Sequence, residues 1–153
     1  AAGKTSTLLN WYEEGTFNAT LSTTGVDFTS VTYSNQSCRY TRIGKLVLVQ
    51  GRVTTTAITF GSSNSQVVIA NLPFTAASSS AGANGRGGLV VNYTSGWGTN
   101  APSHGWVEQG TTRIRLYTRT AANGNSIAMD GTVGSDVSAT SNDIMFSAMY
   151  LCA

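Results

Sequence analysis

Residues 46–58 form the most continuous β-branched run in the chain, and one glycine, Gly51, interrupts it. On both sides of this glycine the side chains alternate between the two faces of a strand. One face carries Leu46, Leu48, Gln50 and Arg52, and the other carries Val47, Val49, Gly51 and Val53. Because Gly44 and Lys45 suit a tight turn, the stretch predicts a β-hairpin with arms at 39–43 and 46–54. Gly51 itself predicts a bulge or a corner. We expect this hairpin to be the centre of a sheet.

The composition favours strands over helices. Only 10% of the 153 residues are charged, whereas soluble domains usually carry about 25%. Threonine, serine, asparagine and glycine take the place of the charged residues, which suits strands and turns. No window of ten or more residues combines a helical period with a capping residue. The length predicts one domain with its own core, and the composition predicts that it is all-β.

Further strands are predicted wherever short alternating segments lie between turn residues. These segments are 16–22, 28–33, 66–70, 89–93, 104–108, 112–118 and 143–151, and the segments 34–37, 75–88, 94–103 and 121–137 are predicted loops. Pro73 cannot donate to a sheet ladder, so we expect Leu72 and Phe74 to close one end of the molecule. About nine strands at short, regular spacing indicate an antiparallel β-sandwich of jelly-roll type.

Several partners and compartments can be excluded or ranked from the sequence. The net charge is +2 with scattered arginines, so nucleic-acid binding is not expected. The longest apolar run is far shorter than the roughly 20 residues of a membrane helix. The first residues lack an initiating methionine and an apolar segment, which predicts a fragment or a processed chain and no signal peptide. Cys38 and Cys152 are expected to be free thiols in a domain made in a reducing cytoplasm.

The chain offers little for catalysis. His104 is the only histidine, so a Ser-His or Cys-His site would have to use it, and the G-x-S-x-G motif is absent. Glu13 and Glu14 are neighbours that point to opposite faces of a strand, and the remaining carboxylates are isolated in turn-like contexts. No cluster of metal ligands is present in the sequence. We therefore expect no catalytic residue, no metal and no cofactor.

A carbohydrate site is better supported. Neutral sugars stack on aromatic faces and take hydrogen bonds from amides and other polar groups, which suits a surface of low charge. The candidate ligand-binding residues are Tyr93, Trp97, Asn100, His104 and Trp106, gathered within fifteen residues around a glycine-rich loop. Trp97 lies between Gly96 and Gly98 and is the hardest to explain as a core residue. Tyr93 and Trp106 can also be core or interface residues, as aromatic residues usually are.

Five segments, taken in order, resemble the C-terminal domain found in many bacteriophage tail fibres and tailspikes. They are 14–21 (EGTFNATL), 31–33 (VTY), 39–47 (RYTRIGKLV), 69–74 (IANLPF) and 144–150 (IMFSAMY). The resemblance spans nearly the whole chain. The family usually has Trp and Pro where this chain has Phe17 and Ala19, and Gly or Thr where it has Cys38. These are packing positions, so the departures leave the expected fold unchanged.

The resemblance implies a homotrimeric β-sandwich at the distal end of a virion tail fibre, in contact with the bacterial surface. Residues 13–153 would form this domain, and residues 1–12 would link it to an upstream fibre region. The expected function is recognition of a host polysaccharide or lipopolysaccharide, without enzymatic activity or membrane insertion. The first alternative is a domain that only trimerises and caps a fibre, and a polysaccharide depolymerase is the least favoured reading. Candidates for the trimer interface are Val47, Val49, Val53, Met145, Met149 and Leu151.

Overall fold

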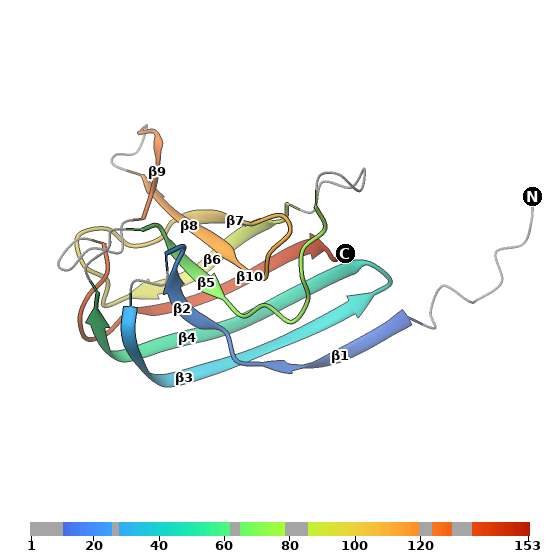
Figure 1. The fold of residues 1–153 in the computed structure, drawn as a ribbon, viewed down its shortest axis with the longest axis horizontal. Helices are drawn as coiled ribbons and strands as arrows, with labels where there is room; N and C mark the ends of the chain where they lie inside the picture. The colour runs from blue at the N-terminus through green and yellow to red at the C-terminus, as the bar shows by residue number, and fades with distance from the viewer. Residues whose placement is uncertain (1–10, 26–27, 62–64, 79–85, 120–123, 130–135) are drawn as a thin grey trace, which may run out of the picture.

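The computed structural model describes residues 11–25, 28–61, 65–78, 86–119, 124–129 and 136–153 (Figure 1). Within these residues the chain forms ten strands and no α-helix. The strands are β1 (Tyr12–Phe17), β2 (Thr20–Thr23), β3 (Phe28–Ile43), β4 (Leu46–Phe60), β5 (Val67–Ala70), β6 (Gly88–Ser95), β7 (His104–Val107), β8 (Ile114–Arg119), β9 (Ser126–Ala128) and β10 (Asp143–Leu151). The all-β prediction is confirmed.

One antiparallel sheet contains all the strands. Its order is β1-β3-β4-β10-β6-β7-β8-β5-β2, and β9 pairs with β8. The sheet curls, so that β2, β5 and β8 lie across from β3, β4 and β10 (Figure 1). Tyr33 of β3 ties the two sides together, since its hydroxyl accepts the Leu21 N–H of β2 at 3.0 Å. The structure thus has the two facing layers expected of an antiparallel sandwich with about nine strands.

The central hairpin is confirmed and is longer than predicted. Gly44 has a φ of 60° at the turn, and β3 and β4 pair from Ile43–Leu46 back to Phe28–Phe60. The predicted loop at 34–37 is wrong, because β3 runs through it without a break. Register shifts between Phe28 and Asn35 allow this, as bulges change which side chains face inward without ending the strand.

The segment predicted as one strand at 16–22 is two strands with different partners. Its first part belongs to β1, which pairs with β3, and its second part forms β2, which pairs with β5. Ala19 lies between them, fully buried, and its carbonyl accepts a hydrogen bond from Gln36 Nε2 at 2.9 Å. Alternation of side chains is the same on both sides of this crossing, so the sequence pattern does not reveal it.

Gly51 does not form the predicted bulge. β4 keeps its register with β3 and β10 at this position, where Gly51 pairs with Cys38 and Phe146. A Cβ atom at residue 51 would lie 2.3 Å from Cys38 Sγ. The glycine is therefore required by the close approach of a neighbouring side chain.

The core lies between the two layers and is built from alternate residues of the strands. Its largest fully buried side chains include Val47, Val49, Val53, Val67, Ile69, Val107, Ile114, Leu116, Met129, Ile144 and Phe146. The three valines of β4 were candidates for a trimer interface; they occupy the core of a single chain instead. Cys38 and Cys152 are both buried free thiols, as expected.

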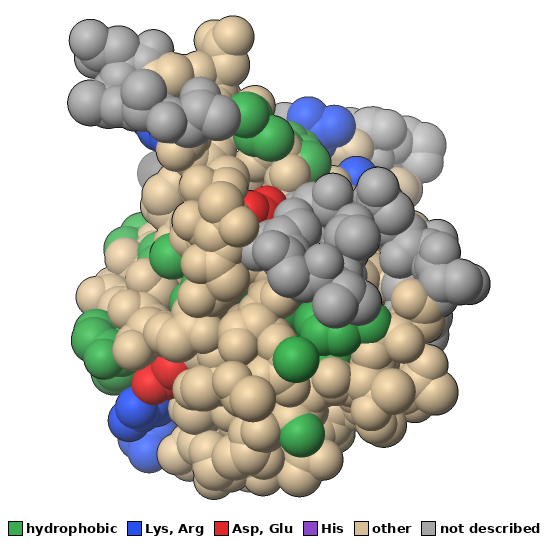
Figure 2. All heavy atoms as spheres, turned by 90° about the vertical axis from the view of Figure 1, so that its left-hand side faces the viewer, with side chains coloured by type: hydrophobic (Ala, Val, Ile, Leu, Met, Phe, Trp, Pro, Cys, Tyr) green, Lys and Arg blue, Asp and Glu red, His purple; other side chains and the backbone are tan. Residues whose placement is uncertain are grey.

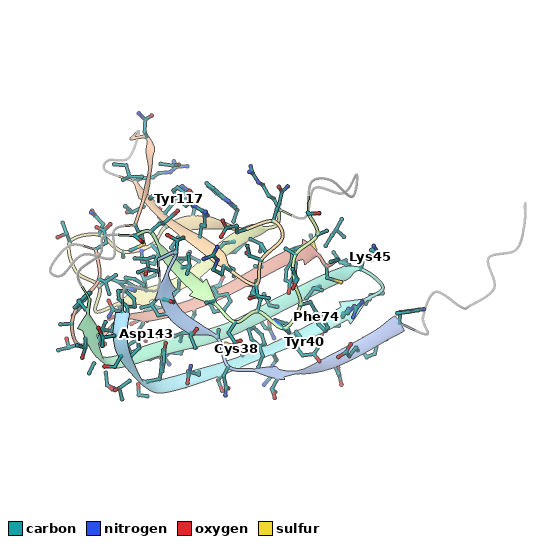
Figure 3. All side chains as sticks on the ribbon, viewed as in Figure 1. Cys38, Tyr40, Lys45, Phe74, Tyr117 and Asp143 are labelled. Carbon is teal, nitrogen blue, oxygen red and sulfur yellow. The ribbon has the colours of Figure 1, made fainter. Side chains whose placement is uncertain are left out.

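The residues on either side of Pro73 pack against the core. Leu72 is buried, and Phe74 packs edge-on against Tyr40 with ring centroids 5.2 Å apart (Figure 3). β1 begins at Tyr12, and residues 1–10 of the predicted linker lie outside the described residues. The described residues include no helix that could span a membrane.

Candidate functional site

An aromatic cluster lies on the outer surface of β7 and β8. Val107 of β7 is fully buried, so the alternation of the strand turns His104 and Trp106 outward. In β8 the buried Ile114 and Leu116 alternate with the outward Arg115 and Tyr117. The turn between the strands is closed by Gly110, which has a φ of 67°. These positions meet because His104 pairs with Tyr117 and Trp106 with Arg115 across the two strands.

Gly105 allows β7 to lie close to β6 and β8. A Cβ atom at this position would lie 2.2 Å from the Arg115 carbonyl oxygen and 2.9 Å from Leu89 Cδ2. Only a glycine allows β7 to pack this tightly between β6 and β8. The close approach brings the side chains on either side of Gly105 over the outer surface of β8.

The rings form a row. Trp106 and Tyr117 are stacked with centroids 4.2 Å apart and planes 24° apart, and the His104 ring lies 5.8 Å beyond Tyr117. The guanidinium of Arg86 lies 6.0 Å from the centroid of the Trp106 ring. Figure 3 places Tyr117 on β8. We call the surface formed by Arg86, His104, Trp106, Arg115, Tyr117 and Arg119 the aromatic–arginine face.

Glu108 organises the arginines of this region. Arg115 Nη2 donates to Glu108 Oε1, and Arg113 Nη2 lies 3.1 Å from Oε2. Arg115 Nη1 also donates to Gln66 Oε1 at 2.9 Å, so the guanidinium is fixed from two sides. A hollow of about 310 Å³ opens here, lined by Arg86, Trp106, Glu108, Gln109 and Arg115. Its walls combine one aromatic surface with fixed hydrogen-bond donors.

His104 contacts two hydroxyl groups. Ser103 Oγ lies 2.8 Å from Nδ1, and Ser126 Oγ lies 2.7 Å from Nε2. Partial burial, and then the nearby charge of Arg119, lowers the pKa of His104 from its usual value, which favours the neutral ring. Among the described residues, no carboxylate contacts His104 and no cluster of metal ligands occurs. The ring is thus arranged as a hydrogen-bonding group.

The other predicted ligand-binding residues lie elsewhere. Trp97 is partly buried against the core, and its Nε1 donates to the Asp143 carbonyl at 2.9 Å. Asn100 donates to Asp136 Oδ1 at 2.7 Å. Tyr93 is exposed on β6 and pairs with Met145 of β10. Of the five predicted residues, the structure brings together His104 and Trp106.

Tyr117, Arg115 and Arg86 were not among the sequence candidates. Two of them could have been found, because a hairpin of 104–108 and 112–118 places Tyr117 opposite His104 and Arg115 opposite Trp106. Arg86 follows a segment outside the described residues and carries no comparable local signal.

A second surface lies on the outer side of β4, β10 and β6. Six apolar side chains between 39% and 59% exposed occupy it: Leu46, Leu48, Val90, Tyr93, Met145 and Met149. Leu48 pairs with Met149 across β4 and β10, and Met145 pairs with Tyr93 across β10 and β6. Gln50 and Ser147, which pair with each other, lie between the two pairs, and Val90 lies opposite Ser147 on β6. We call this surface the apolar face. Isolated exposed apolar residues are ordinary, but a contiguous set usually marks a contact surface.

The end of the sandwich at which β10 begins resembles neither the aromatic–arginine face nor the apolar face. Figure 2 shows uncharged polar side chains and backbone over most of the described part of this end, with apolar side chains scattered and few charges. One charged pair near β10 is Arg52 with Asp143, whose Nη2 and Oδ2 atoms are 2.5 Å apart.

Comparisons with known proteins place the fold. No protein-family model matches the sequence, and no curated protein matches it. Among solved structures, the chain is similar to the Dettilon tailspike protein, with a TM-score of 0.65 and 16% sequence identity. The fold is found in a phage tailspike. The match covers 93% of this chain and 24% of the tailspike chain, so this chain spans about a quarter of the length of the protein it resembles.

Proposed function

We propose that this chain is the receptor-binding domain of a phage tail fibre or tailspike and recognises a polysaccharide of the host cell surface. The observation that carries the proposal is the likeness of nearly the whole chain to one segment of a tailspike protein. The five sequence segments that resemble tail-fibre domains support the same reading. The proposed location is the distal end of the fibre in the virion.

The apolar face supports assembly into a homotrimer. Its leucine, methionine and valine side chains lose contact with water if a second copy covers them, which stabilises association by roughly 25 cal/mol per Å² buried. Ile43 and Tyr12 extend the exposed apolar surface onto β3 and β1. A cyclic trimer would cover this surface on each subunit.

A capping domain that trimerises without a ligand is the main alternative. Binding of fluorescently labelled domain to a panel of bacterial strains separates the two. The receptor proposal predicts saturable binding to particular strains and competition by polysaccharide purified from those strains. Absence of binding to every strain that the parent phage infects would favour the capping role.

We propose further that the domain binds without hydrolysing its ligand, and that neither nucleic acid nor membrane insertion is part of its function. His104 contacts the hydroxyl groups of Ser103 and Ser126, an arrangement that suits hydrogen bonding to a ligand. A hydrolase that used Ser126 as its nucleophile would need His104 as the general base, so substitution of His104 tests for such an activity. Release of reducing ends or acetate from a bound polysaccharide, lost in His104→Ala, would contradict the non-enzymatic proposal.

A further inference from the structure

The hollow beside Trp106 combines an aromatic wall with surplus positive charge. Its lining, together with Arg113, brings three guanidiniums, those of Arg86, Arg113 and Arg115, around the single carboxylate of Glu108. Arg113 and Arg115 share the one carboxylate of Glu108, so this group of side chains carries a net positive formal charge. Arg119 adds another positive charge beside His104, at the far end of the aromatic row. Among the described residues, no carboxylate forms an ion pair with Arg119.

We propose that the aromatic–arginine face binds an anionic glycan, with one acidic sugar seated in the hollow between Arg86 and Trp106. The proposal rests on the receptor function proposed above and adds a site and a ligand class to it. The ligand class is a polysaccharide that carries carboxylate or phosphate groups.

The size of the hollow fits one sugar unit. Its volume of about 310 Å³ lies at the lower end of the range for small-molecule sites, which is about 300–1,000 Å³. The Arg86 guanidinium lies over the Trp106 ring, 6.0 Å from its centroid, and Tyr117 stacks on that ring with centroids 4.2 Å apart. A pyranose could place its C–H surface against the indole while Arg86 donates to its acidic group.

The second arginine of the hollow is already oriented. Arg115 is held by Glu108 and Gln66, so little conformational entropy is lost when it donates to a ligand. Glu108 is engaged by Arg113 and Arg115, and this pairing offsets its repulsion of an anion. Beyond Trp106, the row through Tyr117 to His104 offers further ring edges and hydroxyl groups to neighbouring sugars.

The apolar face lacks this combination. It presents aliphatic and methionine side chains and one tyrosine, Tyr93, and the neighbouring Arg52 is engaged by the Asp143 carboxylate. The apolar face lies on β4, β10 and β6, whereas the aromatic–arginine face lies mainly on β7 and β8. A ligand on the aromatic–arginine face is therefore compatible with subunit contacts through the apolar face.

The test is binding of the labelled domain to a microarray of purified bacterial capsular polysaccharides and O-antigens, half of them acidic. Single-stranded DNA and inorganic polyphosphate are included as anions without the same sugars. The expected result is binding to acidic polysaccharides and its loss when their carboxylates are reduced to alcohols or their phosphates are removed. Preference for neutral polysaccharides, for DNA or for polyphosphate would overturn the proposal.

Variants locate the site. Arg86→Gln and Trp106→Ala should each raise the dissociation constant for the bound polysaccharide about tenfold, the effect of losing one charge-assisted contact. Lys45→Gln removes one positive charge at the β3–β4 turn, and Trp11→Ala removes an exposed tryptophan immediately before β1. Both variants should bind like the wild type. Circular dichroism and thermal midpoints confirm that each variant folds.

The outcomes separate the two proposals. If the array and host cells are bound but Arg86→Gln and Trp106→Ala bind as tightly as the wild type, the receptor function stands and the assignment of this site is wrong. If neither the array nor any host strain is bound, the receptor function and the site fail together.

Discussion

The Cys38 side chain fills the space that a side chain at residue 51 would need. The two residues are paired across β3 and β4, and a Cβ atom on Gly51 would lie 2.3 Å from Cys38 Sγ and 2.8 Å from its Cβ. The position of Cys38 is shown in Figure 3. The cysteine and the glycine therefore form a matched pair in the core at the middle of the central hairpin.

Gly51→Ala should lower the free energy of unfolding by about 1–3 kcal/mol, the usual cost of overpacking a core. Chemical denaturation monitored by tryptophan fluorescence measures the change. Adding Cys38→Gly should recover part of the loss, because it opens the space that the new methyl group requires. Gly88→Ala is the control, since nothing lies within 4 Å of its added Cβ. Additive effects of the Gly51 and Cys38 substitutions would contradict the pairing.

Thr55 should be sensitive to loss of its hydroxyl group. It is buried, its Oγ1 donates to the Thr140 carbonyl at 3.1 Å, and it accepts the Asn142 N–H at 3.0 Å. Thr55→Val leaves the buried Asn142 N–H without this partner and should cost about 1–3 kcal/mol of stability. The neighbouring Thr56 is exposed, so Thr56→Val should change stability by less than about 0.5 kcal/mol. Equal effects of the two substitutions would show that this network does not hold the loop before β10.

Asp143 should make the stability depend on pH in the acid range. The Arg52 guanidinium, assisted by Thr54, lowers the pKa of this carboxyl below its usual 3.8, so the unfolded chain binds the proton more readily than the folded one. The contribution is fully present above pH 3.8 and is lost as the pH falls through the lower pKa of the folded state. Asp143→Asn should therefore be less stable at pH 7 and show a flatter decline below pH 4.

Denaturation curves from pH 2.5 to 7 measure this contribution. Arg52→Gln should flatten the acid decline as well, because it removes the group that lowers the Asp143 pKa. If the free energy of unfolding falls as steeply at low pH in both variants as in the wild type, other carboxylates cause the decline.

The apolar face should control the oligomeric state. We expect the wild-type domain to sediment at three times its mass of 16.0 kDa. A Leu48→Lys and Met149→Lys double variant places two like charges side by side on this face and should sediment as a monomer. Arg119→Glu, on the aromatic–arginine face, should leave the trimer intact. A monomeric wild type at micromolar concentration would contradict the trimer proposal.

The sequence predicts strands well where alternation and turn residues agree. β10 has the predicted bounds, and the hairpin turn lies at Gly44 and Lys45. The sequence pattern does not predict strand boundaries and partners that are set by tertiary contacts. The same alternation continues through residue 19, although β1 and β2 pair with different strands, and bulges carry β3 through residues that resemble a loop.

The candidate site shows the same limit. Trp97 has glycine neighbours typical of an exposed loop, yet its ring packs against the core and its N–H bonds to the chain at Asp143. His104 and Trp106 come together with Tyr117 because of strand register, which is set by the whole hairpin. The hollow also depends on Arg86, which precedes β6 and is distant in sequence from the other residues of the lining, so no local pattern indicates it.

The most direct test of the receptor proposal compares two treatments of a bacterial strain to which the labelled domain binds. Cells are oxidised with periodate, which destroys surface sugars, or digested with proteinase K, which removes surface proteins, and binding isotherms are measured on both. A glycan receptor predicts that binding is lost after periodate and retained after proteinase K. Loss after proteinase K with full binding after periodate would show that the receptor is a protein and contradict the account.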